Sequence, residues 1–183
     1  EYWNLEPEHG YYVTRNESSI IAWRVPAHAI GGWRIAASHS DSPTWRIKNT
    51  NVNAAGCIKL NVEGYGGMIM STWLDRPLSA AGRIIVSEKG KLVSKLVNLD
   101  RTTLVIPYVA IRMDRNANGE HAWNIQQDLL PPYGTEDDSQ SFMGAVADAA
   151  QDAPENILGH DLYHYSRIEG TLWGEQHGFT SSS

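Results

Sequence analysis

The sequence predicts an α/β protein whose chain is interrupted by a β-rich segment. Runs of β-branched and aromatic residues open the chain, strongly alternating runs and a hairpin signal fill its middle, and one amphipathic helix and one further strand follow. We therefore expect three parts. Residues 1–50 begin an α/β domain, residues 51–155 form the β-rich segment, and residues 156–183 return to the first domain.

Three strands are expected in the first part. The runs at 11–14 and 19–25 are rich in Tyr, Val and Ile, and the run at 33–37 has the small and β-branched character of a buried strand. Ser42-Pro43 then breaks the pattern. The third run therefore predicts a strand that gives way to a loop just before residue 43.

The middle part predicts antiparallel strands. Apolar and polar residues alternate over 58–63, as in a half-buried strand. The runs at 82–87 and 92–97 flank Glu88-Lys-Gly-Lys91, which is a hairpin signal. The run at 103–111 is also β-rich, but Pro107 within it indicates an edge or bent strand.

A long loop, a helix and a strand complete the predicted order. Residues 114–135 are rich in Asn, Gly, Gln and Pro, and loops of that length are often functional or interfacial. Residues 139–152 predict the one clear helix, with Pro154 beyond its end. Residues 157–165 return to strand.

Composition excludes several classes of function. The formal net charge of −6 argues against a nucleic-acid or anionic-membrane partner, because phosphate binding needs a surplus of Lys and Arg. No apolar run is long enough to cross a membrane, and no signal peptide is visible at the N-terminus. Cys57 is the single cysteine, which excludes an internal disulfide and fits a reducing compartment. We therefore expect a cytoplasmic protein.

The tripeptide His39-Ser40-Asp41 is the candidate metal-binding feature. His39 follows the predicted strand at 33–37, and the ends of strands are where open α/β sheets place their ligands. Asp41 lies two residues further on, where its carboxylate can hold one imidazole N–H and raise the basicity of the other ring nitrogen. The alternative is a polar strand end capped by a hydrogen bond.

Two other motifs favour structural interpretations. Gly64-Tyr-Gly-Gly67 lacks the spacing and the following Lys of a nucleotide site, so it predicts a tight turn. His160 and His164 have the spacing of zinc ligands on a helix. That segment reads as a strand, however, and no Glu directly follows His160.

Several motifs together resemble the aspartyl aminopeptidase family of zinc metallopeptidases. They occur in the family's order and cover nearly the whole chain. The motifs are Tyr12-Val-Thr-Arg-Asn16, Ser18-Ser-Ile-Ile21, Ser38-His-Ser-Asp-Ser-Pro43, Val62-Glu-Gly-Tyr-Gly-Gly67, Thr72-Trp-Leu-Asp-Arg76, Ala81-Gly-Arg83, the strand from Ile106-Pro107 to Ile111, and Glu169-Gly-Thr171.

The resemblance implies both a fold and an activity. It implies part of a zinc-peptidase α/β sandwich, interrupted by a β-rich dimerisation domain, in a homo-oligomer that is commonly a dodecamer. The implied function is that of a hydrolase, a metallo-aminopeptidase that removes N-terminal residues, acidic ones in the best-known members, from peptide substrates. His39 falls on a zinc ligand, and Asp41 falls on the catalytic-site carboxylate that supports it. The complete site of the family holds two Zn²⁺ ions.

The resemblance also implies that this site is incomplete here. In the family, the stretch corresponding to residues 178–183 runs into the segment that carries the bridging aspartate. The paired glutamates, a further aspartate and the last histidine follow that segment. One imidazole and one carboxylate cannot hold two zinc ions, since each needs about four ligands. We therefore expect this chain to be the N-terminal portion of the enzyme, active only with the C-terminal portion, which a second chain could carry.

Arg112 departs from the family pattern. Well-known members have at this position a histidine that reaches the neighbouring subunit's active site. Arginine is a fixed cation, so it excludes acid–base work at this position. A competing hypothesis assigns the chain to another class, a non-catalytic assembly module that dimerises through its β-rich segment and retains the His-Ser-Asp loop as a relic.

Overall fold

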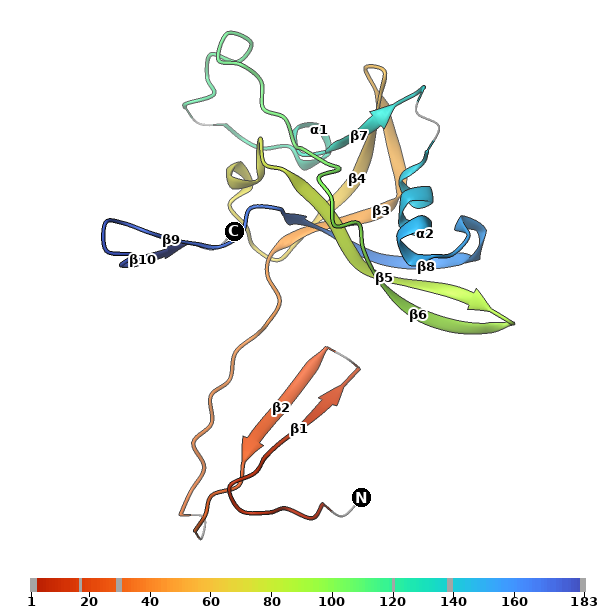
Figure 1. The fold of residues 1–183 in the computed structure, drawn as a ribbon. Helices are drawn as coiled ribbons and strands as arrows, with labels where there is room; N and C mark the ends of the chain where they lie inside the picture. Colours follow the sequence, from red (N-terminus) through yellow and green to blue (C-terminus); the bar gives the residue numbers. More distant parts are fainter. Residues whose placement is uncertain (1–2, 17, 29–30, 120, 138–139, 182–183) are drawn as a thin grey trace. The chain divides into compact units, whose positions relative to one another are not determined.

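Two units, residues 1–41 and 42–183, make up the chain, and each is described by itself (Figure 1). The structure is a computed structural model. The residues that it describes are 3–16, 18–28, 31–119, 121–137 and 140–181.

The first unit holds one antiparallel hairpin. Strands β1 (Gly10–Arg15) and β2 (Ser19–Arg24) pair along their whole length, with Gly10 opposite Arg24. The ring of Trp23 lies 5.2 Å from that of Trp3 and 6.0 Å from that of Tyr11. These aromatic contacts hold one side of the hairpin together. The pairing of β1 with β2 confirms the two strands expected here.

The second unit is built on a six-stranded antiparallel sheet (Figure 1). Its strand order is β6-β5-β8-β3-β4-β7, so the last strand of the sheet along the chain, β8, lies between the two hairpins β3–β4 and β5–β6. A separate pair, β9 with β10, follows the sheet. The bounds are β3 Thr44–Ala54, β4 Cys57–Tyr65, β5 Leu78–Glu88, β6 Lys91–Asn98, β7 Pro132–Thr135, β8 Ile157–Ser166, β9 Thr171–Trp173 and β10 Phe179–Ser181.

The β5–β6 hairpin ends in a two-residue turn. Glu88 pairs with Lys91, which leaves Lys89 and Gly90 as the two turn residues. Their φ angles are +50° and +75°, as the two-residue type I′ turn requires. The predicted hairpin is confirmed.

One face of the sheet carries the core. Alternating positions along the longer strands are buried on this face, and the loops around 104–106 and 129–130 add further apolar side chains. Its fully or nearly fully buried members include Trp45, Ile47, Leu60, Val62, Leu78, Ile84, Val86, Leu104, Ile106, Leu129, Leu130, Phe142, Val146 and Leu162.

Short helices complete the unit. Helix α2 (Phe142–Ala150) is capped by Ser141, whose hydroxyl accepts from the Gly144 N–H at 3.0 Å, and it buries Phe142 and Val146. It lies next to β6, and Lys95 on that strand reaches Asp152 just beyond the helix. The other short helices are α1 (Ile125–Asp128) and the 3₁₀ turns η1 (Met70–Trp73) and η2 (Pro154–Asn156).

Two predicted strands are absent from the structure, and one strand was missed. Among the described residues, the run at 103–111 forms only isolated β-bridges, at Leu104 and Ile106. Residues 33–37 form no strand, and the side chains of Trp33 and Ile35 are 71% and 86% exposed. A strand needs a hydrogen-bonded neighbour, and in the described part of the chain this segment has none. Conversely, β3 was missed because its sequence after Ile47 is polar; a register shift between Ile47 and Asn51 breaks the alternation there.

Of the helices that the structure describes, none is long and apolar enough to span a membrane.

Candidate functional site

His39 and Asp41 form a hydrogen-bonded pair in the first unit. The segment that carries them, 31–41, runs without helix or strand. The His39 Nδ1 lies 2.9 Å from the Asp41 Oδ1 and 3.0 Å from the Asp41 backbone oxygen. The two-residue spacing therefore brings carboxylate and carbonyl to the same ring nitrogen.

This contact assigns the tautomer of His39. A carbonyl oxygen only accepts hydrogen bonds, so Nδ1 carries the proton and donates it. The hydrogen bond to the Asp41 carboxylate, together with its negative charge, raises the pKa of His39. The lone pair of a neutral His39 is consequently on Nε2, and the carboxylate makes that nitrogen a better ligand.

The pair has the chemistry of one zinc ligand and the carboxylate that supports it. The His39 side chain is 81% exposed, so Nε2 is accessible. A histidine whose other ring N–H is held by a carboxylate is the usual arrangement behind a zinc ligand. Among the described residues, no cluster of three or more His, Cys, Asp or Glu side chains is placed to hold a metal ion. The described residues thus fit one ligand of such a site and supply no others.

The other residues and motifs singled out from the sequence lie in the second unit. Arg112 is exposed in the turns that follow the β-bridge at Ile106. His160 and His164 are on strand β8, so the helical zinc-ligand spacing does not apply to them. Gly66 has a φ of +76° just beyond β4, where the chain bends, as the glycine-rich motif suggests.

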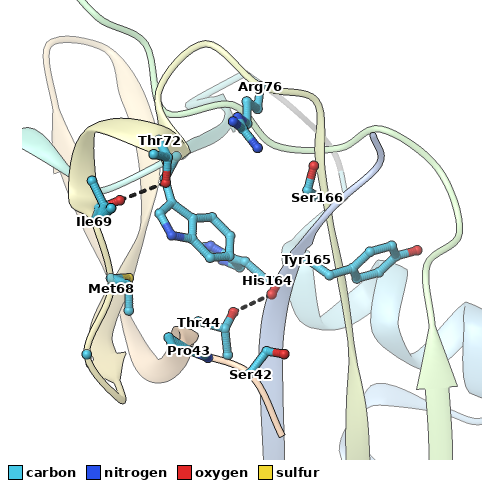
Figure 2. Close-up of a pocket in the computed structure, with 12 residues that line it drawn as sticks. Ser42, Pro43, Thr44, Met68, Ile69, Thr72, Arg76, His164, Tyr165 and Ser166 are labelled. Atoms are coloured by element: carbon cyan, nitrogen blue, oxygen red, sulfur yellow. Dashed lines mark hydrogen bonds between the residues drawn. The ribbon is translucent and has the colours of Figure 1, made fainter. Parts of the chain in front are cut away.

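A pocket in the second unit was not anticipated from the sequence. It has a volume of about 650 Å³ and lies between the start of β3, the turn η1 and the end of β8 (Figure 2). Met68, Ile69 and Trp73 provide apolar walls, whereas Arg76, His164 and Ser166 provide polar groups. The only signal in the sequence was a histidine at an apolar position of the predicted strand 157–165.

Comparison with known proteins places the chain among the metallopeptidases. Residues 1–183 match the family described as aminopeptidase I zinc metalloprotease (M18). The chain belongs to that family. The sequence-based assignment is therefore confirmed.

The relatives that the chain matches are longer than it is. A probable M18 family aminopeptidase 2 of Clostridium acetobutylicum is 41% identical over 191 residues, which cover 99% of this chain and 44% of the relative. The chain thus spans less than half the length of this relative.

Solved structures show the same fold. A chain in the structure of the Ape4 and Nbr1 complex is 32% identical, with a TM-score of 0.85 over 97% of this chain and 38% of that one. Chaetomium thermophilum mApe1 is 30% identical, with a TM-score of 0.77 over 97% of this chain and 44% of that one. The S. cerevisiae mApe1 dodecamer, 24% identical over 78% of this chain and 33% of that one, has a TM-score of 0.60. The predicted fold class, an α/β peptidase fold with a large β-rich part, is confirmed.

Proposed function

We propose that this chain is the N-terminal portion of a zinc metallo-aminopeptidase that hydrolyses N-terminal residues, acidic ones included, from peptides. In this proposal His39 is a metal ligand and Asp41 is the carboxylate that supports it. The observation that carries it is the donation of the His39 Nδ1–H to Asp41 at 2.9 Å, which directs the opposite nitrogen to a ligand.

The two residues have distinct tasks. His39 binds through Nε2 as a neutral imidazole, and Asp41 fixes its tautomer and its ring orientation through two acceptor atoms. Zinc bound in such a site polarises the scissile carbonyl and lowers the pKa of a bound water. The exposure of His39 leaves room for further ligands to approach from other parts of the protein.

The proposal requires the rest of the protein. A complete site would hold two zinc ions, and one imidazole supplies one of the roughly four ligands that each needs. The relatives are more than twice as long as the part that matches, which leaves ample chain for the other ligands. The C-terminal portion would either follow in the same polypeptide or travel as a second chain. Residues 1–50 and 156–183 would belong to the catalytic domain, and residues 51–155 to the dimerisation domain.

We further propose a cytoplasmic homo-oligomer. Leu92 and Leu96 are 74% and 83% exposed on β6, an edge strand of the sheet, and such side chains are typical of surfaces that another subunit covers. A dodecamer is the assembly that the solved S. cerevisiae neighbour forms. The single cysteine fits a reducing compartment.

Activity measured with and without His39 tests the function. The protein is purified from its source together with anything that remains bound to it, and release of N-terminal residues is assayed on peptides starting with Asp, Glu or Leu. The His39→Ala variant should lose activity, and it should bind zinc more weakly because one ligand is missing. The matched control, His28→Ala, replaces another exposed histidine of the same unit and should retain both.

The non-catalytic assembly module is the alternative outcome. An oligomeric preparation with no companion polypeptide, no bound zinc and no peptidase activity would support it. A zinc-loaded, active preparation that His39→Ala leaves unchanged would contradict the role of His39 while retaining the family's activity.

A further inference from the structure

Strand β6 forms one edge of the six-stranded sheet. It stands first in the strand order, and in the described part of the chain only β5 pairs with it (Figure 1). Its eight residues exceed the usual strand length of about five or six. Proteins normally keep edge strands short or guard them, because their unpaired backbone groups can bind another strand.

The pairing with β5 decides which backbone groups of β6 face outward. Glu88 and Lys91 flank the two-residue turn, and the pair next to such a turn is hydrogen-bonded. Hydrogen-bonded and non-hydrogen-bonded pairs then alternate along the ladder. The even-numbered residues from Leu92 to Leu96 therefore direct their N–H and C=O groups to the free edge.

The side chains of these even-numbered residues lie on the face of the sheet opposite the core. Val93 and Val97 pack with the core. Alternation along the strand places Leu92, Ser94 and Leu96 on the other face, where the two leucines are 74% and 83% exposed. The edge thus combines open backbone groups with two exposed leucines.

Charge does not guard this edge. A lysine on an edge strand often prevents pairing by pointing its charge outward. The side chain of Lys95 is half-buried instead, and its Nζ lies 2.6 Å from the Glu88 Oε1 and 2.7 Å from the Asp152 Oδ2. Two carboxylates thus hold this charge on the side of the sheet that carries α2.

The sequence of β6 is complementary to itself. Leu92 and Leu96 each lie two residues from Ser94. If two β6 strands pair antiparallel about a two-fold axis at Ser94, each Leu92 lies opposite the Leu96 of the other copy. The residues whose backbone groups face outward then meet one another, which allows hydrogen-bonded pairs at positions 92, 94 and 96.

The neighbouring registers are less favourable. An axis at Lys95 would overlap the two strands equally well, but it would place both Lys95 side chains directly opposite each other. An axis at Val93 would place Lys95 opposite the Lys91 of the other copy. Like charges directly opposite destabilise a sheet. Of these three registers, only the one centred on Ser94 pairs leucine with leucine and keeps the lysines apart.

We infer that β6 pairs antiparallel with the β6 of a second copy of this chain, about a two-fold axis at Ser94. The contact joins the two six-stranded sheets into one continuous sheet and covers the exposed leucines of both copies. The inference rests on the homo-oligomer proposed above and specifies one contact within it.

Charges placed at the two leucines test the contact in the complete protein. A double variant with Leu92→Lys and Leu96→Lys puts lysines opposite each other across the axis, and a second one, with Leu92→Glu and Leu96→Glu, does the same with glutamates. Alone, each should lower the native mass of the assembly about twofold or more, as measured by native mass spectrometry. Mixed, the two variants bring opposite charges together and should recover the parent's mass. This recovery excludes misfolding as the cause of the loss.

Cysteines report the register, after the native Cys57 is replaced by serine. Ser94→Cys should form a disulfide-linked dimer on oxidation, because the Cα atoms of a hydrogen-bonded pair are about 5.5 Å apart. The matched control Leu92→Cys should stay unlinked, since its two copies would be four residues apart along the strands, or about 13 Å. Co-expressed with Leu96→Cys, the Leu92→Cys chain should form the disulfide.

Three results would each overturn the inference. The first is a monomeric parent protein. The second is an assembly that keeps the parent's mass in both double variants, because its copies would then meet elsewhere. The third is an oligomer in which Ser94→Cys does not link, as when another part of the protein covers β6. Peptidase activity is measured on the same parent preparation. Any of the three results in an active enzyme contradicts this contact alone, whereas an inactive parent that forms the contact contradicts the peptidase proposal alone.

Discussion

Gly82 on β5 is the position where a single added methyl group should do the most damage. Its φ is +153°, a conformation that side chains rarely adopt. A Cβ built there would lie 2.1 Å from the Asp161 backbone oxygen and 2.9 Å from the Leu162 Cα. Both atoms belong to the backbone of β8, which is held between two neighbouring strands and cannot easily move.

The cost of Gly82→Ala follows from these two effects. Backbone strain at an unfavourable φ amounts to about 1–3 kcal/mol, and overpacking adds about 1–3 kcal/mol, so a loss of about 2–6 kcal/mol is expected. Because the contact is with central backbone, the upper half of that range applies. A domain has a stability of about 5–15 kcal/mol, so the variant should be strongly destabilised.

Urea denaturation followed by tryptophan fluorescence measures the loss, since Trp45 is fully buried in the same sheet. The matched control is Gly159→Ala on β8, where an added Cβ meets nothing within 4 Å. That variant should be unchanged or stabilised by about 0.5–1 kcal/mol, because alanine loses less entropy on folding. A Gly82→Ala protein within about 1 kcal/mol of its parent would refute the reasoning.

Three further predictions follow from the packing, the ion pairs and the proposed site. Ile84→Ala, at a fully buried position, should destabilise the protein by about 2–5 kcal/mol in the same assay, and a smaller loss would contradict its place in the core. The Lys95 Nζ lies 2.7 Å from the Asp152 Oδ2 and lowers the pKa of Asp152 from 3.8 to about 2. The ion pair therefore stabilises the folded protein above pH 3.8, and this stabilisation is lost as the pH falls through 2. Asp152→Asn should therefore be less stable than its parent at neutral pH, with the difference shrinking between those two pH values; a pH-independent difference would argue against the pair. Asp41→Asn should weaken zinc binding about 10- to 100-fold, as measured by competition with a chelator. If the variant and its parent bind zinc with equal affinity, Asp41 does not belong to the proposed site.

The fold was predictable where a strand's partner lies nearby in the sequence. The β5–β6 hairpin has its register set by Lys89 and Gly90, so alternation and turn chemistry together were sufficient. The run at 33–37 has equally good strand propensity, but propensity does not supply a partner. Strand β3 shows the converse, because pairing with β4 and β8 overrides its polar composition.

Part of the candidate site could likewise be predicted from the sequence, and part of it could not. His39 and Asp41 are two residues apart, so their contact could be expected from local chain geometry alone. The burial of His164 depends on β5 and β3 flanking β8, and no local pattern reports that arrangement. The sequence therefore indicated the local pair and not the pocket.

The central place of β8 has a consequence for how the protein is made. During synthesis the hairpins β3–β4 and β5–β6 leave the ribosome long before residues 157–166, and each then presents an open edge to solvent. Only the arrival of β8 joins them into one sheet. Such late, long-range pairing is slow and leaves open edges exposed to wrong partners. The nascent chain should therefore depend most on chaperones in the interval just before β8 emerges.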